Sequence, residues 1–343
     1  MHQPLTGERG EGYSQISLIS IQKNMSRRSL FKNILTIVKI LAGLALLILS
    51  VQGIRWGNLL TGIRSADLAW LVLAVSSVLL GLFFKFWRWV ILVKNYHIRS
   101  SMTRLYGAYF VGQAVNITLP LRGGELVRIG YFAGEPKILP EIASTIVLEK
   151  YLDLMALTVC GLLVSYKISL DNILNLGDWL LPLTGIMTML ILSAILFGPA
   201  LWGKIRTGKF LPERLIDWLD RWVQASLWLR DPKQVFPAVL MTILIWGVMW
   251  LTNLLLFKSL GLLLGGTAAG LVLILVYVGL IPALMPGNIG PFYFFASQAV
   301  MPFGIIHDQA FVFAALLHFI VTLPALLGGL TGLLVRPARA VRS

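Results

Sequence analysis

A series of apolar runs, each close to the length of a membrane-spanning helix, constrains this chain more than any other feature. Hydrophobic residues make up 57% of the 343 residues and charged residues only 13%, whereas soluble domains carry about a quarter charged residues. Several runs reach the roughly 20 apolar residues that cross a bilayer as an α-helix. The sequence lacks the short alternating segments typical of a membrane barrel. It therefore predicts an all-α polytopic membrane protein.

The charged residues and the single cysteine exclude several classes of function. A net charge of +14 can indicate nucleic-acid binding, but here Lys and Arg lie at the ends of apolar runs, where they orient a membrane protein. Cys160 stands alone, so no disulfide framework is expected. The sequence contains no P-loop, no metal-spaced His/Cys/Asp cluster and no Gly-x-Ser-x-Gly motif. We therefore expect no nucleic-acid partner, no metal, no cofactor and no enzymatic activity.

The apolar runs predict six full spans, two interrupted segments and one amphipathic surface helix. The full spans are 34–51, 67–93, 143–166, 179–202, 236–257 and 309–335, the interrupted segments are 106–140 and 267–303, and the surface helix is 211–229. Lys and Arg are frequent before the first span, after the second, between 202 and 236, and after the last. The positive-inside rule then places both termini in the cytoplasm. Each interrupted segment must be a re-entrant hairpin, and the two must enter from opposite faces.

This topology divides the membrane domain, 33–335, into halves 33–170 and 171–335, between basic cytoplasmic tails 1–32 and 336–343. Each half has three spans and one hairpin, so the second half is inverted relative to the first. The offset between Pro120 and Pro286, 166 residues, also places Gly124 on Gly290. Matches as few as these can arise by chance. Inverted repeats whose interrupted helices meet near the bilayer midplane are typical of transporters.

The first hairpin is interrupted between Pro120 and Gly124, where a short helix can begin inside the membrane. Proline suits the first turn of a helix, and the free N–H groups behind it form an anion site. Arg122, Glu125 and Arg128 recur at three-residue intervals, close to one helix face. Two guanidinium groups beside a helix N-terminus suit a lipid phosphate. The alternative is an ordinary cytoplasmic loop whose arginines only set the topology.

The span 143–166 carries two acidic residues, Glu149 and Asp153, one helical turn apart. Like charges at this spacing repel unless a cation lies between them or one is protonated. Lys150 is adjacent but points about 100° away, so Arg122 or Arg128 is the expected partner. The pair can belong to a substrate site or to a structural ion pair that holds the hairpin to the span. Both roles can hold together.

The second hairpin has its own interruption but lacks charge. Its helix breakers are Pro286, Gly287 and Gly290, and its polar residues are Asn288, Tyr293, Gln298 and, on the last span, His318. A lone histidine on an apolar helix is more typical of a core position than of a proton carrier. Arg88 stands between two tryptophans, a pattern that predicts an interfacial anchor.

The order and spacing of these motifs resemble the flippase-like integral membrane family, which includes the transmembrane region of lysylphosphatidylglycerol synthases. The motifs that carry the resemblance are Arg88-Trp89, Asn116, Leu119-Pro120, Arg122-Gly123-Gly124-Glu125, Arg128, Glu149, Asp153, Pro286-Gly287-Asn288-Ile289-Gly290 and Leu323-Pro324. It extends over 34–335. The sequence departs from the family pattern at Lys150 and His318, where arginine is expected, and in lacking an acid soon after Gly290.

The resemblance implies movement of a lipid rather than its synthesis, because the chain ends at Ser343 without the aminoacyl-transfer domain of the synthases. The predicted substrate site consists of Asn116, Arg122, Gly123, Gly124, Glu125, Arg128, Glu149, Asp153, Asn288 and Gln298. The arginines would hold the lipid phosphate, and the carboxylates would balance them and accept any cationic part of the headgroup.

The expected substrate is a phospholipid or a polyprenyl-phosphate-linked lipid, and the expected location is the inner membrane of a prokaryote. A separate lipid- or glycan-synthesis enzyme is a possible partner. Two alternatives stay open. One is a membrane transferase that acts on a polyprenyl phosphate, with Glu149 or Asp153 as its base. The other is a scaffold of a lipid- or glycan-synthesis complex.

Overall fold

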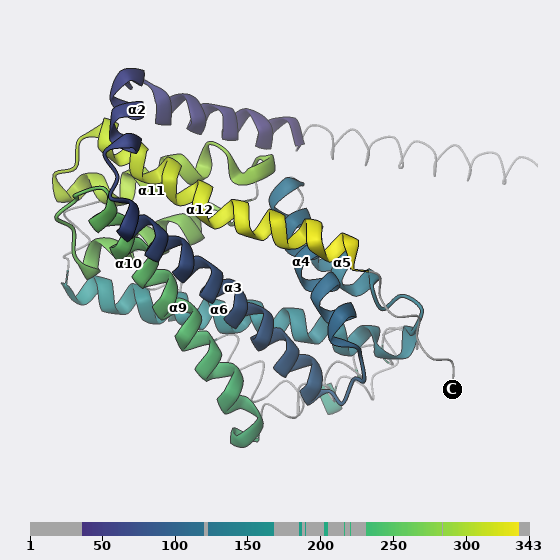
Figure 1. Cartoon of the computed structure of the whole chain (residues 1–343). Coiled ribbons are helices and arrows are strands. Elements are labelled where there is room, and N and C mark those ends of the chain that lie inside the picture. The colour runs from purple at the N-terminus through teal and green to yellow at the C-terminus, as the bar shows by residue number, and fades with distance from the viewer. Residues whose placement is uncertain are drawn as a thin grey trace, which may run out of the picture.

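The structure, a computed structural model, describes residues 36–119, 123–167, 231–282 and 284–335, with isolated positions between 185 and 220. Every regular element in these residues is a helix (Figure 1). Among them, α3 (Leu68–Asn95), α9 (Pro232–Ser259) and α12 (His307–Leu334) are long and apolar enough to cross a membrane. The part of the chain that the structure describes is thus all-helical, with helices of the length and composition of an integral membrane protein.

Five of the predicted spans coincide with helices. These are the helix Thr36–Val51, α3, α6 (Leu139–Lys167), α9 and α12. α2 (Trp56–Arg64) connects the first of them to α3. The predicted span 179–202, the surface helix 211–229 and the tails 1–32 and 336–343 lie outside the described residues, apart from isolated positions.

Both interrupted segments consist of a helix, a break and a shorter helix. The first comprises α4 (Met102–Thr118) and α5 (Gly124–Gly130), and the second α10 (Gly266–Gly279), the 3-10 turn η4 (Pro286–Asn288) and α11 (Pro291–Val300). Pro120 and Arg122 fall in the first break, outside the described residues. In the second break, Gly287 and Gly290 have φ angles of 67° and 92°. Glycine adopts this backbone region without strain, so these breakers turn the chain between η4 and α11.

Helix lengths recur in the same order along the chain. The first unit, α3 to α6, has helices of 28, 17, 7 and 29 residues, and the second unit, α9 to α12, has helices of 28, 14, 10 and 28 residues. A 3-10 turn follows the short helix in each unit, η1 (Pro136–Ile138) after α5 and η5 (Met301–Phe303) after α11. The two units thus share one sequence of elements.

Packing between the units is reciprocal. α3 packs against α9, α4 against α12, and α10 against α6, so each hairpin lies on the last helix of the other unit. α3 and α9 lie side by side in opposite directions (Figure 1). The Asp67 N–H donates to the Ser259 carbonyl (2.7 Å) at one end of this pair. The Asn95 amide donates to the Gln234 carbonyl (3.2 Å) at the other end.

Candidate functional site

Two glycines hold α5 close against α4. A Cβ atom on Gly124 would overlap the carbonyl oxygen of Gly112, and a Cβ atom on Gly112 would come within 2.8 Å of the Gly124 carbonyl oxygen. Asn116 Oδ1 accepts a hydrogen bond from the Gly124 N–H at 2.8 Å, which satisfies one of the free amides at the start of α5. Gly123 is the N-cap residue of the same helix. Asn116 and Gly124 therefore fix the position of α5.

Arg128 of α5 pairs with Glu149 of α6, as predicted. Arg128 Nη2 lies 2.5 Å from Glu149 Oε2, and the two residues are only 6% and 4% exposed. The guanidinium carbon also lies 4.2 Å from the ring centre of Trp89 and 5.1 Å from that of Tyr109, a cation–π geometry. This pair ties the short helix after the break to the long helix that closes the first unit.

Asp153 has a different partner from the one predicted, because its cation is Arg88 of α3. Arg88 donates from Nη1 to Asp153 Oδ1 at 2.7 Å and from Nη2 to Oδ2 at 3.1 Å, a bidentate pair. Arg88 Nη1 also donates to the hydroxyl of Thr242 at 3.1 Å, and Trp246 Nε1 donates to Asp153 at 3.4 Å, both from α9. Arg88 is 2% exposed. The prediction that Arg88 is an interfacial anchor is therefore wrong, since α3 turns it inward between α6 and α9.

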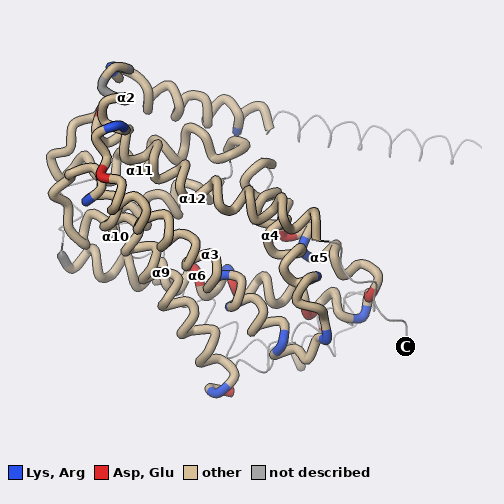
Figure 2. Tube along the Cα trace, in the orientation of Figure 1, with Lys and Arg blue, Asp and Glu red and all other residues tan. Residues whose placement is uncertain are grey.

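Glu125 and Lys150 form a third pair at 3.0 Å, in which the lysine side chain is 60% exposed. Each of the three predicted site carboxylates, Glu125, Glu149 and Asp153, thus has a cationic partner. We call Arg88, Arg128, Glu149 and Asp153 the charged cluster. Figure 2 shows that most charges lie at helix ends, while a few lie along the middle of the α3 and α6 tubes.

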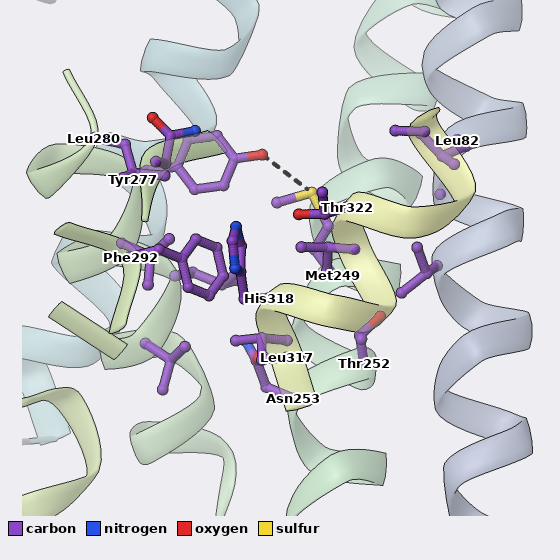
Figure 3. Close-up of a pocket in the computed structure, with 18 of the residues that line it drawn as sticks. Leu82, Met249, Thr252, Asn253, Tyr277, Leu280, Phe292, Leu317, His318 and Thr322 are labelled. Atoms are coloured by element: carbon purple, nitrogen blue, oxygen red, sulfur yellow. Dashed lines mark hydrogen bonds between the residues drawn. The ribbon is translucent and has the colours of Figure 1, made fainter. Parts of the chain in front are cut away.

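A cavity of about 250 Å³, the central cavity, lies between the two units (Figure 3). Its walls come from α3 and α4 of the first unit and from α9, α10, η4, α11 and α12 of the second. The polar residues that line it are Ser77, Lys85, Gln113, Thr252, Asn253, Tyr277, Asn288, His318 and Thr322. The predicted binding residue Asn288 is thus a lining residue. Gln298, another predicted residue, is not one of them.

His318 holds the second break in place. Its Nε2 lies 2.8 Å from the carbonyl oxygen of Gly287, and its Nδ1 lies 3.1 Å from the hydroxyl of Tyr293. Because a carbonyl oxygen only accepts, Nε2 donates and Nδ1 accepts the tyrosine proton. The ring is 8% exposed and packs against Phe292. His318 therefore has the contacts of a core histidine, as its position on an apolar helix predicted.

Lys85 is the cavity residue that sequence reasoning missed. It lies one turn before Arg88 on α3, and its Nζ is 3.4 Å from the hydroxyl of Tyr277. Among the described residues, no carboxylate oxygen lies within 4.0 Å of this ammonium group. Its position inside the predicted span 67–93 could have identified it from the sequence. A charge at membrane depth is costly and is usually functional.

Comparison with known families yields a match. A family model described as the lysylphosphatidylglycerol synthase TM region matches residues 36–329. No curated protein and no solved structure gives a match. The matched residues include the charged cluster, the central cavity and both units except for the last residues of α12.

Proposed function

Because the chain belongs to the family of the lysylphosphatidylglycerol synthase transmembrane region, we propose that it moves a lipid between the two leaflets of a membrane without changing it chemically. The observation that carries the proposal is the central cavity, which combines polar and apolar walls and takes residues from both units. Such a site can receive a headgroup while the acyl chains stay in an apolar environment. Membership of this family supports a function connected with membrane lipids.

The two units form an inverted repeat in this proposal. Their helices correspond in order and length, and α3 and α9, the corresponding first helices, are antiparallel. A two-fold axis between α3 and α9 would exchange the α4–α12 contact with the α10–α6 contact. Transporters with such repeats expose a central site to each face in turn by moving one part against another.

The charged cluster keeps the helices of the first unit together during transport. Separating Arg128 from Glu149 would leave a buried charge without a partner, which costs about 3–5 kcal/mol. Breaking a neutral hydrogen bond such as that between Tyr293 and His318 costs only about 1 kcal/mol. The moving part is therefore the second hairpin, α10 with α11, and its movement opens the central cavity. The charged cluster is structural in this account.

The protein operates in the inner membrane of a prokaryote with both termini in the cytoplasm, in keeping with the distribution of Lys and Arg. The function needs no catalytic residue and no cofactor. A lipid- or glycan-synthesis enzyme that makes or uses the transported lipid is the expected partner.

Proteoliposomes with fluorescent phosphatidylglycerol test this function. Dithionite added outside destroys only the label that reaches the outer leaflet, so transport makes the inner-leaflet label reducible. Thr322→Trp should fill the central cavity and stop transport, whereas Leu327→Trp, at an exposed position of the same helix, should leave it intact.

Mass spectrometry of the recovered lipid completes the test. A chemically unchanged lipid is expected. A covalently altered lipid would favour a membrane transferase, and a lipid that is neither moved nor altered would favour a scaffold. Either result would contradict the proposed function.

A further inference from the structure

Among the described residues, the charges at the centre of the first unit do not cancel. The ionisable residues at its centre are Lys85, Arg88, Arg128, Glu149 and Asp153. Each of the two carboxylates pairs with one arginine. Lys85 therefore carries an excess positive charge beside the central cavity. A half-buried positive charge in excess of the negative charges around it is costly, so the site favours an anion.

The hydrogen-bond partner of Lys85 among the described residues is neutral. Lys85 Nζ donates to the hydroxyl oxygen of Tyr277, which in turn donates to the sulfur of Met249 at 3.4 Å (Figure 3). A phenol oriented in this way offers the ammonium group a lone pair but no negative charge. The remaining polar lining residues are amides, hydroxyls and His318, whose donor nitrogen is already bonded to a carbonyl.

The size and the walls of the central cavity limit the ligand further. Its volume of about 250 Å³ is below the roughly 300–1,000 Å³ of common small-molecule sites, so it fits a headgroup rather than a whole lipid. The amide of Asn288 and the hydroxyl of Thr322 face the same space and can donate to phosphate oxygens. No Asp or Glu is among the described lining residues. A cationic amine on the headgroup would therefore find no partner there.

We infer that Lys85 binds the phosphate of a lipid headgroup in the central cavity, and that the cavity selects lipids of net negative charge over zwitterionic ones. This inference rests on the proposed function for the lipid nature of the ligand. Lys85 is thus a specificity-determining residue. This inference places the phosphate on Lys85, whereas the sequence prediction placed it on Arg122 and Arg128.

Ligand-induced stabilisation of the purified full-length protein tests the inference, because a ligand that binds the folded state raises the unfolding temperature. Dioctanoyl phosphatidylglycerol should stabilise the wild type at a concentration at least about tenfold lower than dioctanoyl phosphatidylethanolamine, because the ammonium group of the latter would lose its water without gaining an acidic partner. Lys85→Gln should abolish this preference and Lys85→Arg should keep it. Lys94→Gln, which changes an exposed lysine on the same helix, should behave as wild type.

Three results would overturn the inference. They are equal stabilisation of the wild type by both lipids, a preference that survives in Lys85→Gln, and stabilisation by inorganic phosphate alone that matches that by phosphatidylglycerol. The last would identify a site for a free anion rather than for a lipid. If the preference depends on Lys85 but liposomes show no lipid movement, the proposed transport fails and the anionic-lipid site stands.

A second variant keeps the test independent of folding defects. Without added lipid, Lys85→Met should unfold at a temperature equal to or above that of the wild type, because it removes a half-buried charge that has no carboxylate within 4.0 Å among the described residues. A clearly lower unfolding temperature would show that Lys85 has a structural partner, which would overturn the inference.

Discussion

The two units contact their short helices in corresponding ways but with different chemistry. In the first unit, Arg128 of α5 meets Glu149 of α6 at 2.5 Å. In the second, Tyr293 of α11 meets His318 of α12 at 3.1 Å. Each contact joins the helix after the break to the long last helix of its unit. The first is a buried ion pair between aromatic rings, and the second is a hydrogen bond between two neutral groups.

This difference indicates which unit can move. A buried ion pair that is pulled apart leaves two unpaired charges at low dielectric, whereas a neutral hydrogen bond is lost at a much smaller cost. The central cavity takes more of its wall from the second unit, including His318 and Asn288 beside the second break. The comparison therefore supports the proposal that the charged unit stays closed and the neutral unit opens.

The largest expected effect comes from breaking the ion pair of the first unit. Glu149→Gln leaves the Arg128 guanidinium buried without its anion and should lower the free energy of unfolding by about 3–5 kcal/mol. Thermal or denaturant unfolding in detergent measures this loss. The matched control, Arg128→Met with Glu149→Leu, replaces both partners by apolar groups and should lie close to the wild type. If Glu149→Gln lowers the free energy of unfolding no more than a change at His318 does, the two contacts are equally strong. The proposed difference between the two units would then be wrong.

The next largest loss of stability is expected from disturbing the close contact between α5 and α4. Gly124→Ala places a methyl group on the Gly112 carbonyl oxygen and should destabilise the protein by about 1–3 kcal/mol, as overpacking does. Gly130→Ala in the same helix is the control, since a Cβ atom there has no neighbour within 4 Å. The same unfolding measurement applies. Equal behaviour of the two variants would show that α4 and α5 are not in close contact.

The neutral contact of the second unit should give a smaller loss. Tyr293→Phe removes the hydroxyl that donates to His318 Nδ1 and should cost about 1 kcal/mol. Tyr166→Phe, at a position that is 88% exposed, controls for the loss of a hydroxyl. A loss for Tyr293→Phe as large as that for Glu149→Gln would contradict the assignment of the second unit as the weaker one.

The smallest effect is expected at the exposed pair of the first unit. Lys150→Gln removes the partner of Glu125 from a side chain that is 60% exposed, so it should cost no more than about 1 kcal/mol. Any difference from the wild type should shrink as the salt concentration rises, because exposed charges are screened. Unfolding at low and at high salt checks this. A large, salt-independent loss would place this pair in the buried charged cluster.

Much of the architecture could be predicted because apolar periodicity and helix breakers act locally. The helices at five predicted spans and the break at Pro286 follow from residues close together in the sequence. The pairing of Arg128 with Glu149 followed from the few basic residues near the acidic span.

Partners on distant helices could not be predicted in the same way. Arg88 contacts Asp153 and Thr242, and this depends on how α3 rotates against α6 and α9. The flanking tryptophans indicated an interface, yet Trp89 is fully buried and donates to Thr145. Lys85 was missed for the same reason, since only the packed helices show that it faces a cavity. The predicted role of Arg122 stays a prediction, because this residue lies outside the described ones.

Cysteine labelling tests the inverted relation of the two units. In a Cys160→Ala background, Arg99→Cys lies in the loop between α3 and α4, and Leu263→Cys lies in the corresponding loop between α9 and α10. Both positions are exposed. A membrane-impermeant maleimide should label the two variants from opposite faces of the membrane, with Arg99→Cys reached from the cytoplasm. Labelling of both variants from the same face would contradict the inverted arrangement.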